Sequence, residues 1–202
     1  MLFPPAIPAV HSYTLQALDI HREEDNRMWE AISLGNLGTN YERCDQPERA
    51  LLYFREARAL HKQLGSLFGS GVTAVYIGEL MRRQGDLDEA HVSLLGALEV
   101  AQRLDSDDLR CRARLALARL GLVAGPPALA QEHIDAGLSA AQRLSAASFL
   151  SELAACDGLL ALGRGERESA MDALSRARDL IAQATPQESL QALSAALEAE
   201  AD

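Results

Sequence analysis

The histidines and cysteines of this 202-residue chain lack the spacing of a catalytic or metal-binding site. No histidine has another histidine three to five residues away, as paired zinc ligands often have. Three scattered cysteines, with no CxxC pair, indicate reduced thiols in a cytosolic protein, buried as small apolar residues. The residues in question are His11, His21, His61, His91, His133, Cys44, Cys111 and Cys156.

Nucleophile and phosphate-binding motifs are also missing. Serine is frequent, but no GxSxG sequence provides a nucleophile elbow. The run Gly163-Arg164-Gly165 resembles a phosphate loop only superficially, because it falls at a predicted turn between helices. The sequence therefore predicts a protein that is not an enzyme and that needs no metal or cofactor.

Arginine is the side chain whose placement suggests binding. Arg82, Arg83, Arg112 and Arg119 are predicted to gather in an otherwise acidic chain. Since a guanidinium binds carboxylates in a bidentate manner, these residues would suit an acidic peptide. The alternative is that they pair with Glu79 and Glu152 of the same chain, and the sequence leaves both interpretations open.

Charge and composition exclude several classes of partner. The net charge is −10 and the pI is near 5.0, which opposes nucleic-acid binding by this segment. No apolar run reaches the roughly 18 residues needed to cross a bilayer, so no membrane association is expected. Aromatic residues are only 4% while hydrophobic residues are 48%, a composition that favours helices over sheets.

These residues are positioned by a repeat of 40 residues. Shifting the chain by 40 aligns several columns without gaps, each with its own kind of residue. The small, large apolar and glycine columns share one register. These columns are Ala50, Ala90, Ala130 and Ala170; Phe54, Leu94, Ile134 and Leu174; Ala57, Ala97, Gly137 and Ala177; Gly38, Gly78, Ala118 and Gly158; and Asp45, Gly85, Gly125 and Gly165.

The columns describe a pair of packed helices. Gly38 shares a helical face with Leu34, Leu37 and Tyr41, because these residues are three or four positions apart. The column at position 45 breaks that helix, and a second helix follows. Small residues then lie where the helices cross and large residues fill the gap between them. Stacked pairs would share one continuous core.

The chain resembles the tetratricopeptide repeat (TPR) family through Leu37-Gly38, Tyr41, Ala50, Phe54 and Ala57. The second repeat keeps most of this pattern, whereas Gly121 and Ala161 replace the tyrosine later on. A repeat of 40 residues, rather than the usual 34, is similar to kinesin light chain and to TPR arrays of bacterial regulators. The resemblance covers about residues 10–202.

The resulting fold prediction is all-α: a right-handed solenoid of helical hairpins, with four full repeats and a half-repeat at each end. Helices are expected at 10–25, 28–44, 47–64, 68–84, 87–104, 107–124, 127–144, 147–163, 166–184 and 187–202. We predict one domain over 1–202, composed of a tail (1–9), a half-repeat (10–27), repeats at 28–67, 68–107, 108–147 and 148–186, and a terminal helix (187–202). The half-repeats are either caps or the ends of a longer array.

The resemblance implies that the first helix of each repeat lines a concave groove. Helical phase assigns the predicted peptide-binding residues to these helices. The same phase places Val75, Leu115, Ala116 and Cys156 in the groove, whereas His21 and His61 are expected to stack near the outer surface. The predicted peptide-binding residues are Asn36, Thr39, Arg43, Tyr76, Glu79, Arg82, Arg83, Arg112 and Arg119.

The predicted function is an interaction module in the cytoplasm that binds a protein or peptide segment, acidic if the arginines contact it. The alternative is a regulatory, effector-sensing domain of a larger bacterial signalling protein or transcription regulator. The carboxylate clamp of chaperone-binding TPR proteins is not present as a set. Whether the chain forms a homodimer stays open.

Overall fold

The computed structural model describes residues 6–183, and in that part of the chain every regular element is an α-helix. The helices are α1 (Ala6–Glu23), α2 (Arg27–Arg43), α3 (Pro47–Gln63), α4 (Leu67–Gln84), α5 (Leu87–Arg103), α6 (Asp107–Val123), α7 (Pro127–Leu144), α8 (Ala147–Gly163) and α9 (Arg167–Gln183). The all-α prediction is confirmed for these residues. The expected helix at 187–202 lies outside them.

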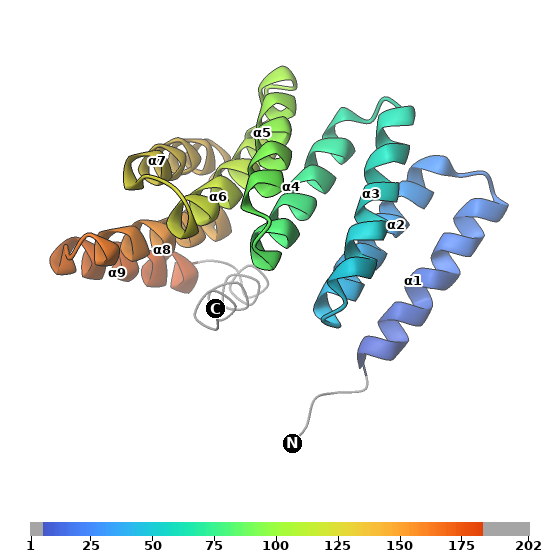
Figure 1. The fold of residues 1–202 in the computed structure, drawn as a ribbon, viewed down its shortest axis with the longest axis horizontal. Coiled ribbons are helices and arrows are strands. Elements are labelled where there is room, and N and C mark those ends of the chain that lie inside the picture. Colours follow the sequence, from blue (N-terminus) through green and yellow to red (C-terminus); the bar gives the residue numbers. More distant parts are fainter. Residues whose placement is uncertain (1–5, 184–202) are drawn as a thin grey trace. The chain divides into compact units, whose positions relative to one another are not determined.

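Two compact units make up the chain, Met1–Val100 and Ala101–Asp202, and the boundary falls within α5. In the first unit α2 packs on α3, with α1 against α2 and α4 against α3 (Figure 1). In the second unit α6 packs on α7, and α8 contacts both α7 and α9. The predicted division into one domain of four repeats stays a prediction.

Left-handed residues end the helices at an interval of 20 residues. Positive φ angles occur at Asp25, Asp45, Gly65, Gly85, Asp105, Gly125, Ser145 and Gly165. The predicted breaks at 45, 85, 125 and 165 are therefore confirmed. At Gly85 the N–H of Asp86 donates to the carbonyl of Met81 at 2.9 Å, the bond of a Schellman motif.

The break at Gly125 differs from the others because Pro126 follows it. At the other breaks the next residue donates its N–H back to the helix, whereas proline has no N–H to donate. Gly125 accordingly has a φ of 149°, far from the 85° of Gly85. The chain leaves α6 in an extended conformation at Ala124.

The glycine column lies where paired helices cross. A Cβ atom built on Gly38 would be 2.5 Å from the ring of Phe54, and one on Gly78 would be 2.6 Å from Leu94. Both large side chains are buried, as are Ala50 and the other alanines of its column. The small-against-large packing predicted from the register is therefore present.

The start of α1 corrects one expectation. The sequence predicts a tail over residues 1–9 and a helix from residue 10, whereas the helix begins at Ala6. Pro8 lies in its first turn, where N–H groups have no partner within the helix, so proline removes no hydrogen bond there.

Candidate functional site

One side of the first helices carries a row of residues at matching repeat positions, most of them exposed or half-buried. We call these residues the first-helix face of the first unit. Spacings of three and four residues place each row on one side of its helix. The face comprises Met28, Ile32, Asn36, Thr39 and Arg43 on α2, and Phe68, Val72, Tyr76, Glu79 and Arg83 on α4.

This face is largely apolar near the start of each helix. The exposed fractions are 40% for Met28, 36% for Ile32, 45% for Phe68 and 37% for Tyr76. The ring of Tyr76 stacks on Phe54 at 5.3 Å between centroids, so the core fixes its position. Exposed apolar side chains that are held in place favour contact with a partner.

Polar residues occupy the other end of the face. Asn36 and Arg43 are exposed, while Thr39 donates its hydroxyl to the carbonyl of Gly35 at 3.3 Å. Arg83 on α4 forms an ion pair with Glu42 on α2, with 3.1 Å between Nη1 and Oε1. This pair joins the carboxyl-terminal ends of the two first helices.

Arg82 lies beside the face rather than on it. Its guanidinium and the carboxylate of Glu79 are both largely buried, and Nε lies 3.3 Å from Oε2. Because the two residues are three positions apart on α4, they form an ion pair between successive turns of one helix. Arg82 therefore already has a carboxylate neighbour in the absence of any partner.

The equivalent side of the second unit is dominated by charge. Arg112 donates to both oxygens of Asp108, at 2.9 and 3.2 Å, and lies 5.5 Å from the ring centroid of Phe149. Arg119 on α6 donates to Glu152 on α8 at 2.6 Å. Pairing within the chain, the alternative interpretation of the sequence, is thus observed for Arg119 with Glu152.

The four arginines divide between the units, Arg82 and Arg83 in the first and Arg112 and Arg119 in the second. Each has a carboxylate from its own unit within 3.3 Å. Their predicted role in peptide binding stays a prediction. A partner carboxylate would have to exchange with a pair that already exists, so the gain per arginine would be small.

Sequence reasoning missed two members of the face and misplaced others. Met28 and Phe68 are one turn before Ile32 and Val72, and the 40-residue shift aligns them as it aligns the rest. Several residues assigned to the groove by helical phase are buried in the packing between helices instead. These are Val75, Leu115, Ala116 and Cys156.

Residues 6–183 contain no candidate site for cysteine or metal chemistry. Cys111 is fully buried, and this burial raises the pKa of its thiol to about 11, so it remains protonated. Cys156 is also buried and Cys44 is half-buried. Within the described residues no cluster of histidine, cysteine and carboxylate side chains could hold a metal ion.

The helices of this part of the chain also lack the apolar length that a bilayer span requires.

His61 corrects a second expectation, because it is buried rather than near the outer surface. Gly69 makes the space: a Cβ atom there would be 2.5 Å from the imidazole ring. His21, one repeat earlier, is half-buried and its Nδ1 lies 2.9 Å from the hydroxyl of Ser33. The Nδ1 of His61 is buried with no hydrogen-bond partner among the described residues.

This burial should make stability depend on pH. Desolvation lowers the pKa of His61, so the folded protein binds its proton less readily than the unfolded chain. The associated stability is fully present above about pH 6.5, the usual pKa of histidine, and is lost as the pH falls below it. One such group changes the free energy of unfolding by at most about 1.4 kcal/mol per pH unit.

Urea unfolding between pH 7.5 and 5 measures this contribution. His61→Ala, which installs the residue found at Ala101 and Ala141 in the same register, should reduce the pH dependence. His91→Ala removes an exposed histidine and serves as the control. If both variants keep the wild-type slope of unfolding free energy against pH, His61 does not contribute to the pH dependence.

Comparison with known proteins identifies the fold. No protein-family model matches the sequence, and no curated protein matches it. Solved structures do match: BtubC (BKLC) from P. vanneervenii superposes with a TM-score of 0.74 at 17% identity, over 90% of this chain and 77% of that one. The TPR-like repeats of a kinesin light chain-type protein from Podosopora anserina give 0.57 at 14% identity, over 91% and 98%.

At this level of identity the likeness shows the fold and not the function. The chain therefore has a TPR-like fold, an all-α helical-repeat solenoid, as the sequence pattern indicates.

Proposed function

We propose that this TPR-like repeat protein is an interaction module that binds a peptide segment of another protein on the first-helix face of the first unit. The observation that supports this most is the row of exposed apolar side chains, Met28, Ile32, Phe68 and Tyr76. A row of this kind offers contacts to apolar side chains of a bound segment, which is the usual basis of peptide recognition by helical surfaces.

The polar members of the face would orient such a segment. Asn36 lies one turn after Ile32, and its exposed amide both donates and accepts hydrogen bonds. Arg43 at the end of α2 is exposed and would favour a carboxylate on the partner. Acidic partners remain part of this proposal through Arg43, whereas Arg82, Arg83, Arg112 and Arg119 would bind them only by exchanging their present pairs.

The proposal places this interaction in the cytoplasm, in keeping with three cysteines that are not joined in disulfides. The net charge of −10 makes nucleic acid an unfavourable partner for this segment. The regulatory alternative uses the same face and differs in the domain to which the array would be attached.

A random peptide library can locate the binding surface before any natural partner is identified. Peptides selected on the wild-type chain should lose at least tenfold in affinity for Ile32→Asp, about 1.4 kcal/mol, because a carboxylate replaces an apolar contact. Leu52→Asp places the same change on an exposed leucine of α3 and is the matched control. Calorimetry gives the affinities, and the melting temperatures show that both variants fold.

Two results would contradict the proposal. Equal affinities of Ile32→Asp and wild type would place the binding surface elsewhere, and a loss with Leu52→Asp alone would place it on the second helices. Sedimentation of the wild-type chain tests a third outcome, in which this face is a contact between copies of the chain. A dimer that Ile32→Asp dissociates would show this outcome and contradict the proposal.

A further inference from the structure

Arg58 occupies a position that the second and third repeats fill with leucine. The 40-residue register aligns it with Leu98, which is buried in the first unit, and with Leu138, which packs against the core of the second. The fourth member of the column, Arg178, is largely exposed on α9. Of the two arginines in this column, Arg58 is therefore the one that is half-buried.

The guanidinium of Arg58 has one buried N–H group without a partner. Its Nε is buried and has no hydrogen-bond partner, and no carboxylate of residues 6–183 forms an ion pair with it. Burial lowers the pKa of the guanidinium, but arginine stays protonated at neutral pH. A cation that is partly removed from water is stabilised by a counterion, and the carboxylate of a ligand would supply one to Arg58.

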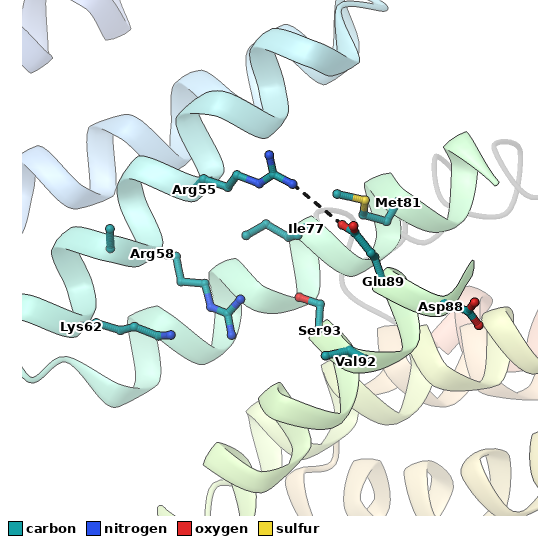
Figure 2. Close-up of a pocket in the computed structure, with 10 residues that line it drawn as sticks. Arg55, Arg58, Lys62, Ile77, Met81, Asp88, Glu89, Val92 and Ser93 are labelled. Carbon is teal, nitrogen blue, oxygen red and sulfur yellow. Dashed lines mark ion pairs between the residues drawn. The ribbon is translucent and has the colours of Figure 1, made fainter. Parts of the chain in front are cut away.

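A cavity of about 580 Å³ adjoins Arg58 between α3, α4 and α5 (Figure 2). Ile77 and Met81 of α4 form its buried apolar wall. Lys62, one turn after Arg58 on α3, extends beside it in Figure 2. The volume is in the range of sites for small organic ligands.

The other charged groups of the cavity limit the charge of a ligand. Arg55 pairs with Glu89 at 3.9 Å, and Asp88 points away from Arg58 at the far end (Figure 2). Two arginines and one lysine against two carboxylates leave the lining with one excess positive charge. A monoanion matches this balance, whereas a phosphate dianion would be repelled by Glu89 and Asp88.

We propose that this cavity binds an amphipathic carboxylate, whose anionic group contacts Arg58 and Lys62 and whose apolar body lies on Ile77 and Met81. The planar guanidinium matches a carboxylate in a bidentate manner. Ser93 lines the cavity, but its hydroxyl already donates to the carbonyl of Ala74 at 2.9 Å and so does not donate to the ligand. This site lies between α3, α4 and α5, and its lining shares no residue with the first-helix face, so the proposal does not rest on the function proposed above.

Hexanoate is the probe for this site, with hexanamide as its uncharged analogue of nearly equal shape. In the full chain labelled with ¹⁵N, hexanoate should shift the Nε–H resonance of Arg58 in a saturable manner. Hexanamide should bind at least tenfold more weakly, because it lacks the charge that the guanidinium requires. Equal binding of the two, or tighter binding of inorganic phosphate than of hexanoate, would overturn the proposal.

Arg58→Leu is the decisive variant because it restores the residue of the repeat register. It should fold at least as stably as the wild type, yet weaken hexanoate binding at least tenfold when affinities are measured by calorimetry. Arg49→Leu removes an arginine from the same helix outside the cavity and should bind hexanoate normally. Unchanged binding by a folded Arg58→Leu variant would refute the site.

The natural source of the carboxylate is distinguished by a second probe, the capped dipeptide N-acetyl-Leu-Glu-amide. Tighter binding of hexanoate than of the dipeptide would indicate a free organic acid, and the reverse would indicate an acidic segment of a protein. In either case the binding must be lost in Arg58→Leu, and retention in that variant counts against the proposal.

Discussion

Replacing Gly38 with alanine is expected to lower the free energy of unfolding by about 1–3 kcal/mol. The added Cβ atom would lie 2.5 Å from the ring of Phe54, closer than such atoms approach in folded proteins. Phe54 is fully buried and the ring of Tyr76 stacks on it, so the Phe54 ring has little freedom to withdraw. Urea unfolding followed by the fluorescence of Trp29, which lies on the same helix, measures the loss.

Gly35→Ala is the matched control on the same helix. A Cβ atom at Gly35 meets no atom within 4 Å, so alanine should stabilise the helix by about 0.5–1 kcal/mol through its higher helix propensity. Replacing glycine with alanine is thus expected to lower the free energy of unfolding at position 38 and to raise it at position 35. Equal unfolding midpoints for the two variants would show that Gly38 is not at a tight helix crossing.

The third repeat supplies a compensating change for Gly38→Ala. It carries Ala118 and Ile134 at the positions of Gly38 and Phe54, and both are buried in one cluster. Phe54→Ile should therefore relieve the clash, and the double variant should be more stable than the sum of the single losses predicts. A coupling energy above about 0.5 kcal/mol would confirm direct contact, while strict additivity would contradict it.

The register can be predicted from sequence because it depends on residue size at fixed spacing. Glycine or alanine opposite phenylalanine, leucine or isoleucine is visible without knowing any side-chain conformation. The 20-residue interval of left-handed residues is harder to predict, since Asp25, Asp105 and Ser145 mark a helix end less strongly than glycine does. Their conformation follows from the bonds that close each helix.

The candidate sites are less predictable because each depends on several helices at once. Helical phase identifies Asn36 and Tyr76 as exposed, but cannot show that Arg83 pairs with Glu42 on another helix. The cavity beside Arg58 cannot be predicted from the sequence for the same reason. Its signal in the sequence is an arginine aligned with Leu98 and Leu138, which becomes informative only once that column is known to be buried.

Leu153→Ala should lower the free energy of unfolding of the second unit by about 2–5 kcal/mol. Leu153 is fully buried on α8 and belongs to a cluster with Ile134 of α7 and Cys111 of α6. Removing its side chain leaves a cavity that three packed helices cannot easily close. Leu159→Ala on the same helix is the control, since Leu159 is 45% exposed and its loss should change stability by less than about 1 kcal/mol.

Gly137 makes this prediction more specific. A Cβ atom on Gly137 would lie 2.9 Å from a methyl group of Leu153, so Gly137→Ala should destabilise the wild type. In the Leu153→Ala background that methyl group is gone, and the added methyl would occupy part of the vacated space. Gly137→Ala should then stabilise the protein, as expected for the alanine found at Ala57, Ala97 and Ala177. Circular dichroism during urea unfolding of the four proteins tests the change of sign; the same sign in both backgrounds would show that Leu153 does not determine the cost of a side chain at position 137.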